Sequence, residues 1–136
     1  RERSVSLEFG AFIPLTVDGD AGLLKRLFVN ILANAVQYTA PGSEVTISCA
    51  EAPETPGTAL VAIADSGPGI PEESLPRIFD RFYRVDSSRS HATGGVGLGL
   101  AIVKKILALH RGTVRVESVP GRGTVFFVYL PETHNN

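Results

Sequence analysis

The chain has 136 residues and a formal net charge of −1. Its size predicts one domain, and it lacks the sustained basic excess typical of proteins that bind nucleic acids or membrane surfaces. Its single cysteine, Cys49, excludes an intrachain disulfide and a cysteine-rich metal site. No apolar run approaches the length of a membrane span, and the N-terminus has no signal-peptide pattern. Because the chain opens directly in a strand-like pattern, we expect it to be a piece of a longer protein.

The first predicted elements are two short strands and a long helix. Apolar residues alternate with polar ones over Val5–Phe9, and a second extended run covers Ile13–Val17. Over Asp20–Thr39 the apolar residues recur at spacings of three and four, which predicts one buried face of a helix. Asp20 is the expected N-cap, because its carboxylate can accept hydrogen bonds from free backbone N–H groups of the first turn.

Four polar side chains stand out along this helix. Asn30 and Asn34 are one turn apart, and Gln37 and Tyr38 extend the row by another turn. Asparagine is unfavourable inside a helix because its side chain competes with the backbone for hydrogen bonds. The row has two explanations: it forms one wall of a polar cleft, or it is the solvated stripe of an ordinary amphipathic helix.

A β-hairpin is predicted next. Residues Val45–Cys49 alternate in polarity, and the apolar run Leu60–Ala64 matches them across a turn at Pro53–Gly57. The hairpin leads into Asp65–Ile70, where an acid at the end of a strand is followed by two glycines. Glycine permits a positive φ angle or a close backbone approach, so this segment is either an Asx-type turn or a loop that approaches a ligand.

A short helix, a loop and a second glycine cluster follow. Pro71–Phe82 begins with proline and two acids, which favour a helix N-terminus, whereas residues 83–93 have no apolar periodicity and predict a mobile loop. Thr93–Leu100 is glycine-rich and runs into the helical pattern of Ala101–Leu109. Such a loop presents backbone N–H groups and the positive end of the helix dipole, which together favour phosphate. It matches neither a Walker loop nor a full Rossmann motif.

Two strands close the chain. Gly112 is expected to end the preceding helix. Strands are predicted over Thr113–Glu117 and Thr124–Leu130, on either side of a turn at Pro120–Gly123.

The polar and glycine-rich segments stand in an order that resembles the ATP-binding catalytic domain of bacterial two-component sensor histidine kinases. This family belongs to the superfamily that also holds gyrase B, Hsp90 and MutL. The matching segments are the N box Asn30–Thr39, the first glycine box Asp65–Ile70, the F box Ile78–Arg84, the second glycine box Gly95–Leu100 and the last glycine motif Gly121–Thr124. The resemblance implies an α/β fold, the two-layer Bergerat sandwich, with a mixed, mostly antiparallel sheet, helices on one face, and ATP held beside a lid loop.

The resemblance also implies ATP and Mg²⁺ as ligands and assigns roles. Asp65 would accept the adenine amino hydrogen, and Asn34 would hold Mg²⁺ with Asn30 assisting directly or through water. Arg84 would neutralise charge at the γ-phosphate, so the candidate catalytic residues are these two asparagines and this arginine. The candidate ligand-binding residues are Asn30, Asn34, Gln37, Tyr38, Asp65, Gly67, Gly69, Ile70, Tyr83, Arg84, Gly95, Val96, Gly97, Leu98, Gly99, Leu100 and Thr124.

Two positions bear on the activity that the resemblance implies. The family usually has lysine where this chain has Gln37, so one positive contact near the phosphates is missing. The resemblance then implies either weaker ATP binding or greater reliance on Arg84 and a neighbouring arginine. The related ATPases carry a glutamate that activates water at the position of Asn30, and an amide cannot act as a general base. Phosphoryl transfer to an external histidine therefore fits better than ATP hydrolysis.

The implied partners lie outside this chain. None of its histidines, His91, His110 and His134, precedes the acid and proline of the family's phosphoacceptor motif, so the acceptor is expected on a separate helical dimerisation domain. A response regulator is the other implied partner. The full-length protein is implied to be a homodimer in the bacterial inner membrane, and this fragment a monomeric cytoplasmic domain. Two alternatives stay open: a nucleotide-binding regulatory module without turnover, and an ATPase of the same superfamily.

Overall fold

The computed structural model describes residues 6–12, 17, 19–37, 44–67, 69–70, 72–80 and 99–132, with residues 6–12, 36 and 37 described by their backbone alone. In chain order the elements are β1 (Ser6–Phe12), α1 (Ala21–Gln37), β2 (Glu44–Glu51), β3 (Thr58–Asp65), the 3₁₀ helix η1 (Glu72–Arg77), α3 (Gly99–Leu109), β4 (Thr113–Val119) and β5 (Gly123–Pro131).

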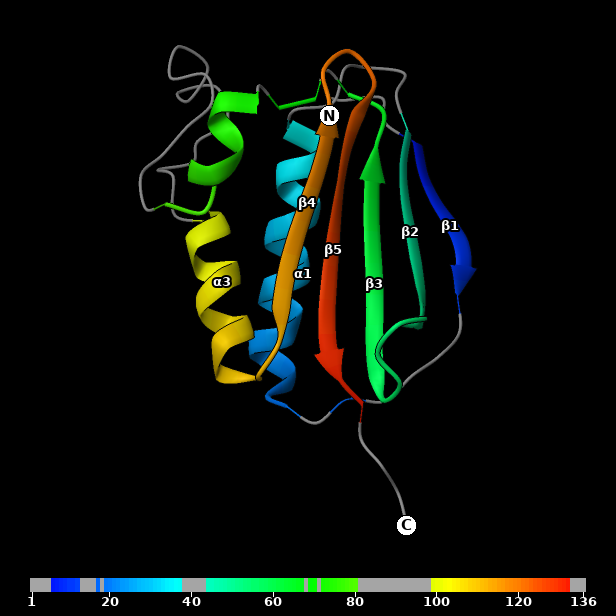
Figure 1. Ribbon diagram of the computed structural model, residues 1–136, viewed down its shortest axis with the longest axis vertical. Helices are drawn as coiled ribbons and strands as arrows, with labels where there is room; N and C mark the ends of the chain where they lie inside the picture. The colour runs from blue at the N-terminus through cyan, green and yellow to red at the C-terminus, as the bar shows by residue number, and fades with distance from the viewer. Residues whose placement is uncertain are drawn as a thin grey trace.

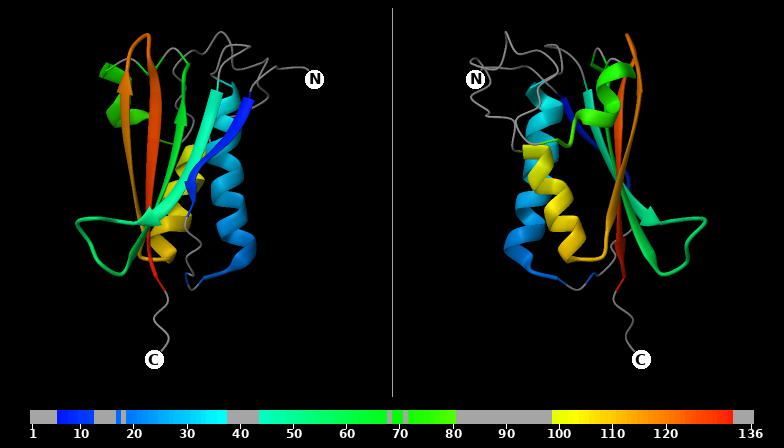
Figure 2. Two further views of the ribbon diagram at one scale, coloured as in Figure 1. Left: turned by 90° about the vertical axis from the view of Figure 1, so that its right-hand side faces the viewer. Right: turned by 60° about the vertical axis from the view of Figure 1, so that its left-hand side comes forward.

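The five strands form one sheet in the order β1-β2-β3-β5-β4. β1 runs parallel to β2, and the other three neighbouring pairs are antiparallel. Figures 1 and 2 show α1 and α3 side by side against one face of this sheet. The predicted two-layer α/β sandwich, with a mixed and mostly antiparallel sheet, is confirmed.

The core lies between the sheet and the two long helices. Strand β5 shows the reason most clearly, because buried side chains alternate along its whole length with partly exposed ones, as the sequence pattern predicts. The helices contribute the apolar faces expected from their spacing. The largest fully buried side chains are those of Leu27, Ile31, Val45, Ile63, Val103, Leu107, Phe126 and Val128.

Helix α1 begins where the sequence predicts. The N–H group of Leu23 donates to Oδ1 of Asp20 (3.0 Å) and the N–H group of Leu24 donates to the Asp20 carbonyl oxygen (2.9 Å). Asp20 is therefore the N-cap.

The end of α3 differs from the expectation that Gly112 stops the helix. The residue in the left-handed region is Arg111, with φ at 59°. The N–H groups of Gly112 and Arg111 donate to the carbonyl oxygens of Leu107 (2.7 Å) and Ala108 (3.3 Å), which is the Schellman arrangement. Gly112 is needed for a different reason: a Cβ atom there would lie 2.6 Å from the carbonyl oxygen of Tyr129.

Other expectations are met in part. Of the second predicted strand, Ile13–Val17, only Val17 is described, and it forms an isolated bridge with Glu132. The short helix is of the 3₁₀ type and contains Pro76, which has no N–H group to donate within an α-helix. The predicted loop at 83–93 lies outside the described residues. Neither described α-helix is long and apolar enough to cross a membrane.

Candidate functional site

Most of the predicted site residues that the structure describes belong to one end of the molecule. The C-terminal ends of α1 and β3, the N-terminal end of α3, and the turn between β4 and β5 all face this end (Figure 1). Helix α1 packs against both α3 and β3, so these ends are held close together. We call this region the ligand end.

Asp65 is the last residue of β3, as predicted. Its backbone pairs with Val45 of β2 on one side and Thr124 of β5 on the other. Burial raises the pKa of its carboxyl group, and hydrogen bonds from the backbone N–H groups of Gly67 and Thr124 partly offset this effect. A carboxylate held this way is fixed in position at the edge of the core.

The Asx-type turn and the ligand-binding loop are compatible at Asp65. Its Oδ1 atom accepts the N–H hydrogen of Gly67 at 2.9 Å, which is the bond of an Asx-type turn. A carboxylate has about four lone-pair sites, so the backbone donors leave acceptor capacity for a ligand. The turn orients the group that the ligand would use.

The turn between β4 and β5 packs tightly against the Asp65–Ile70 segment. Gly69 has a φ angle of 82°, and a Cβ atom on it would lie 2.7 Å from the carbonyl oxygen of Val119. Gly123 has a φ angle of 140°, and a Cβ atom there would lie 2.0 Å from the carbonyl oxygen of Asp65. Both glycines are therefore required by backbone conformation and by close approach.

Ser118 is a residue of the ligand end that lies in none of the sequence motifs. Its Oγ atom accepts the N–H hydrogen of Ile70 at 2.6 Å and lies 3.1 Å from the carbonyl oxygen of Gly123 and 3.0 Å from Oγ1 of Thr124. The available signal was the alternation of β4, which places Ser118 on the same inward face as Val114 and Val116. A hydroxyl group on the same inward face as these valines needs a hydrogen-bond partner within the protein.

The two asparagines lie in α1, one turn apart, and both are half-buried. The Nδ2 atom of Asn30 is buried without a hydrogen-bond partner; within the described residues, Oε2 of Glu132 is the other such side-chain atom. An unpaired buried amide is costly, and a ligand that supplies an acceptor would remove that cost. This finding favours the polar-cleft explanation over the solvated stripe.

A divalent ion at this end would be held by amide and phosphate oxygens. In the part of the chain that the structure describes, no three or more His, Cys, Asp or Glu side chains cluster as a metal site. Asn30 and Asn34 nevertheless fit Mg²⁺, which binds few protein oxygens and keeps several waters. The unpaired Nδ2 group of Asn30 is a hydrogen-bond donor, so its partner would be a phosphate or water oxygen beside the ion and not the ion itself.

The second glycine box is described only at its C-terminal end. Gly99 and Leu100 form the start of α3, and Leu100 packs against the core. The predicted ligand residues Tyr38, Tyr83, Arg84 and Gly95–Leu98, and the side chain of Gln37, lie outside the described residues.

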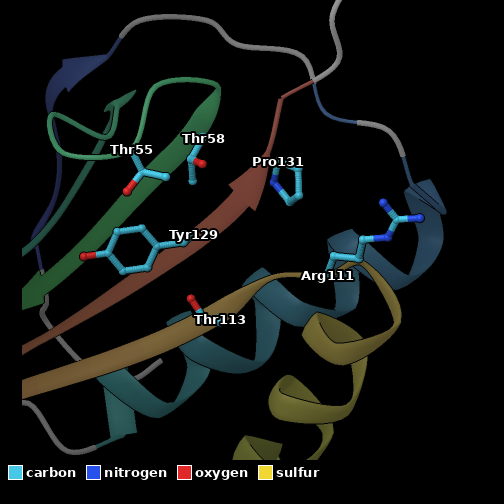
Figure 3. Close-up of a pocket in the computed structure, with 6 residues that line it drawn as sticks. All are labelled: Thr55, Thr58, Arg111, Thr113, Tyr129 and Pro131. Atoms are coloured by element: carbon cyan, nitrogen blue, oxygen red, sulfur yellow. The ribbon is translucent and has the colours of Figure 1, made fainter.

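A separate pocket of about 190 Å³ lies at the opposite end of the sheet (Figure 3). Figure 3 shows the guanidinium group of Arg111 turned away from the hydroxyl groups of the other lining residues. The pocket contains none of the predicted site residues. It is lined by Thr55, Thr58, Arg111, Thr113, Tyr129 and Pro131.

Comparison with known proteins identifies related sequences. The family model for histidine kinase-, DNA gyrase B- and HSP90-like ATPases matches residues 19–134. The sensor-like histidine kinase SenX3 of Mycolicibacterium smegmatis is 45% identical over 114 residues, which are 84% of this chain and 29% of SenX3. The sensor histidine kinase CusS of Escherichia coli O157:H7 is 44% identical over 133 residues, which are 96% of this chain and 26% of CusS. The chain thus spans less than a third of these relatives.

Solved structures agree with the sequence comparison. The mycobacterial sensor histidine kinase MprB superposes with a TM-score of 0.84 at 36% identity, covering 95% of this chain and 84% of that one. Full-length ShkA in complex with AMPPNP superposes with a TM-score of 0.79 at 28% identity, covering 96% of this chain and 26% of that one. The chain therefore belongs to the histidine kinase-, DNA gyrase B- and HSP90-like ATPase family, as a catalytic domain of the sensor histidine kinase type.

Proposed function

We propose that this chain binds Mg-ATP and donates its γ-phosphate to a histidine on a separate dimerisation domain. The observation that carries the proposal is Asp65, a carboxylate whose pKa is raised by burial at the end of β3, where backbone N–H groups of Gly67 and Thr124 hold it. Titratable groups perturbed by burial cluster at functional sites, and this carboxylate keeps acceptor capacity beyond its two backbone donors. The AMPPNP bound in the related ShkA structure supports a nucleotide as that partner.

The base would bind at the end of β3. The Asp65 carboxylate accepts hydrogen bonds and cannot donate one when ionised, so it favours the amino group of adenine over the carbonyl oxygen that guanine presents there. Gly69 and Ile70 would line the base, and Thr124, which is 4% exposed, would support it from β5.

The phosphates would lie between the helices. Asn34 would hold Mg²⁺ through its amide oxygen, and the unpaired Asn30 amide would donate to a phosphate oxygen or a water molecule. When bound, the ion would neutralise negative charge on the phosphate oxygens. The N-terminal end of α3, with the glycine box before it, would supply backbone N–H groups, and Arg84 would add a positive charge.

Transfer to an external acceptor is favoured over hydrolysis by the identity of residue 30. The side chain of Asn30 is an amide, which cannot take a proton from water. Phosphoryl transfer requires mainly positioning and charge neutralisation, and a histidine brought by another domain supplies the nucleophile. The alternative functions, hydrolysis and nucleotide binding without turnover, are outcomes of the tests below.

The same proposal covers the further domains and the partners of the full-length protein. This chain would be one catalytic domain, and the rest of a longer protein would supply the dimerisation, phosphoacceptor and sensor domains, as the greater length of the relatives supports. The full-length protein would be a homodimer in the bacterial inner membrane with this domain on the cytoplasmic side. A response regulator would receive the phosphate.

The test compares two Asp→Asn variants. Asp65→Asn should weaken ATP binding about 10- to 100-fold, because it removes the charge from a partly buried acceptor. Asp20→Asn is the matched control: it makes the same chemical change at the other end of α1, and asparagine caps a helix as well as aspartate does. Isothermal titration with ATP and GTP measures both variants and the wild type.

Two further measurements separate the parts of the proposal. Asn34→Ala should weaken binding much more with Mg²⁺ present than with EDTA, and an equal loss in both would make Asn34 a packing residue. Mixed with a helical domain that carries the acceptor histidine, the wild type should transfer labelled phosphate. Unchanged ATP affinity in folded Asp65→Asn would overturn the adenine assignment, and rapid hydrolysis by the chain alone would favour the ATPase alternative.

A further inference from the structure

We propose that Ser118 is a positioning residue of the nucleotide site and sets its preference for adenine. This inference rests on the proposed function. Ser118 lies near the end of β4 on its inward face and touches both halves of the base-binding region, the Asp65–Ile70 segment and the start of β5. Its hydroxyl group would act on the base through its neighbours, without contacting the base.

The hydrogen bonds of Ser118 can be assigned by counting. A serine hydroxyl has one hydrogen to donate and can accept about two. Ile70 N–H can only donate (2.6 Å), and the carbonyl oxygen of Gly123 can only accept (3.1 Å). If all three bonds are made, the hydroxyl hydrogen of Ser118 goes to Gly123, and Thr124 Oγ1 must donate its own hydrogen to Ser118 (3.0 Å).

The first consequence concerns the backbone that lines the base. The bond from Ile70 ties the end of the Asp65–Ile70 segment to β4, while Gly69 lies against the carbonyl oxygen of Val119. The β4–β5 hairpin therefore contacts the segment at two neighbouring residues, Gly69 and Ile70. Without the Ser118 oxygen, the Ile70 N–H group would lose its acceptor. The segment would then no longer be fixed in position relative to the hairpin.

The second consequence concerns the polarity of the Thr124 hydroxyl. Thr124 pairs directly with Asp65 across the sheet, so both side chains lie on the same inward face. Because its hydrogen is committed to Ser118, the Thr124 oxygen presents only lone pairs to a ligand. Asp65 and Thr124 then both favour an amino group. If the hydrogen were released from Ser118, Thr124 could donate to the carbonyl oxygen of guanine, and selectivity would fall.

The experiment uses two variants of equal shape, Ser118→Thr and Ser118→Val. Both are β-branched and suit a strand, but only threonine retains the hydroxyl group. Ser118→Val should bind ATP about tenfold more weakly than Ser118→Thr, as expected when a hydrogen bond to a partly buried N–H group is lost. Its ratio of GTP to ATP dissociation constants should also fall, and the Ile70 amide should exchange its hydrogen faster in the nucleotide-free protein. Ser48→Ala, on the opposite face of the sheet, is the control and should leave both the affinity and the ratio unchanged.

Each outcome is decisive. Rescue by Ser118→Thr of both the affinity and the nucleotide ratio would support the hydroxyl role, which a merely structural residue would not show. Equal behaviour of Ser118→Val and Ser118→Thr would overturn it, whether both bind normally or both bind weakly. If the wild type bound neither ATP nor GTP, the proposed function itself would be wrong and this inference with it.

Discussion

The polar groups at the two ends of helices α1 and α3 differ in how far they are hydrogen-bonded within the protein. At the end away from the ligand, the N–H group of Asp20 donates to Nε2 of His110 (3.0 Å), and Nδ1 of His110 bonds the carbonyl oxygen of Ile106 (2.8 Å). Both bonds are made by the tautomer with its hydrogen on Nδ1. We call this contact between the start of α1 and the end of α3 the helix junction. At the ligand end, Asn30 Nδ2 has no hydrogen-bond partner among the described residues, and burial raises the pKa of Asp65.

This difference separates stability from ligand binding along the same two helices. In the helix junction the Asp20 N–H group and both ring nitrogens of His110 have partners within the protein, and the packing is close, since a Cβ atom on Gly19 would lie 2.4 Å from the His110 ring. The ligand end keeps acceptor and donor capacity at a cost in folding free energy. Substitutions at the junction should therefore lower stability alone, whereas those at the ligand end should alter binding.

The largest effect is expected from Gly69→Ala, with Gly121→Ala as its matched control. Both glycines have nearly the same positive φ, 82° and 83°, but in the part of the chain that the structure describes a Cβ atom at Gly121 would meet nothing within 4 Å. Gly121→Ala should lower the free energy of unfolding by about 1–2 kcal/mol through backbone strain alone. Gly69→Ala should cost a further 1–3 kcal/mol or so through its clash with the Val119 backbone. It should also weaken ATP binding.

Urea denaturation and ATP titration of these two glycine variants measure the difference. Equal losses of stability in the two variants would mean that the β4–β5 turn moves aside for the new Cβ atom. The close packing of the Asp65–Ile70 segment would then contribute nothing to the free energy of unfolding. If the Gly69→Ala variant is destabilised but binds ATP normally, the contact between Gly69 and Val119 serves stability alone. The two ends would then not differ in the way described above.

His110→Ala tests the helix junction. It removes the acceptor of the Asp20 N–H group, so the free energy of unfolding should fall by about 1–2 kcal/mol. The ATP dissociation constant measured well below the melting temperature should not change. Lys105→Ala, an exposed position on the same helix, is the control for loss of side-chain contacts. A parallel loss of ATP affinity in His110→Ala would show that the two ends are coupled through the helices.

The smallest effect is a pH dependence at Asp65. Its pKa is raised in the folded protein, so the folded state holds this proton to a higher pH than the unfolded chain does. Stability contributed by the protonated form is therefore lost as pH rises from the unfolded pKa through the folded one. Asp65→Asn should thus gain stability relative to the wild type across that window and keep the gain at neutral pH. Denaturation at a series of pH values measures this difference, and a gain confined to acid pH would contradict the sign.

The helices and strands, and the acid at the end of β3, could be predicted from local patterns in the sequence. The spacing of apolar residues in α1, the alternation in β5 and the acid that ends β3 are local patterns, and each is found where it was predicted. Local patterns suffice here because a helix or strand that buries one face repeats every 3.6 or 2 residues. The glycines after Asp65 indicated a positive φ angle or a close backbone approach, and Gly69 shows both.

Contacts between residues far apart in the sequence could not be predicted and are visible only in the folded chain. The Asp20 to His110 bond joins residues 90 positions apart, and Ser118 meets Ile70 across 48 positions. The placement of β5 beside β3 brings Thr124 opposite Asp65. No periodicity encodes these contacts, because they depend on strand order and on side-chain volumes at several positions together. The end of α3 is a second case: the left-handed residue is Arg111, whereas Gly112 is required by its close approach to the carbonyl oxygen of Tyr129, a contact that no local pattern encodes.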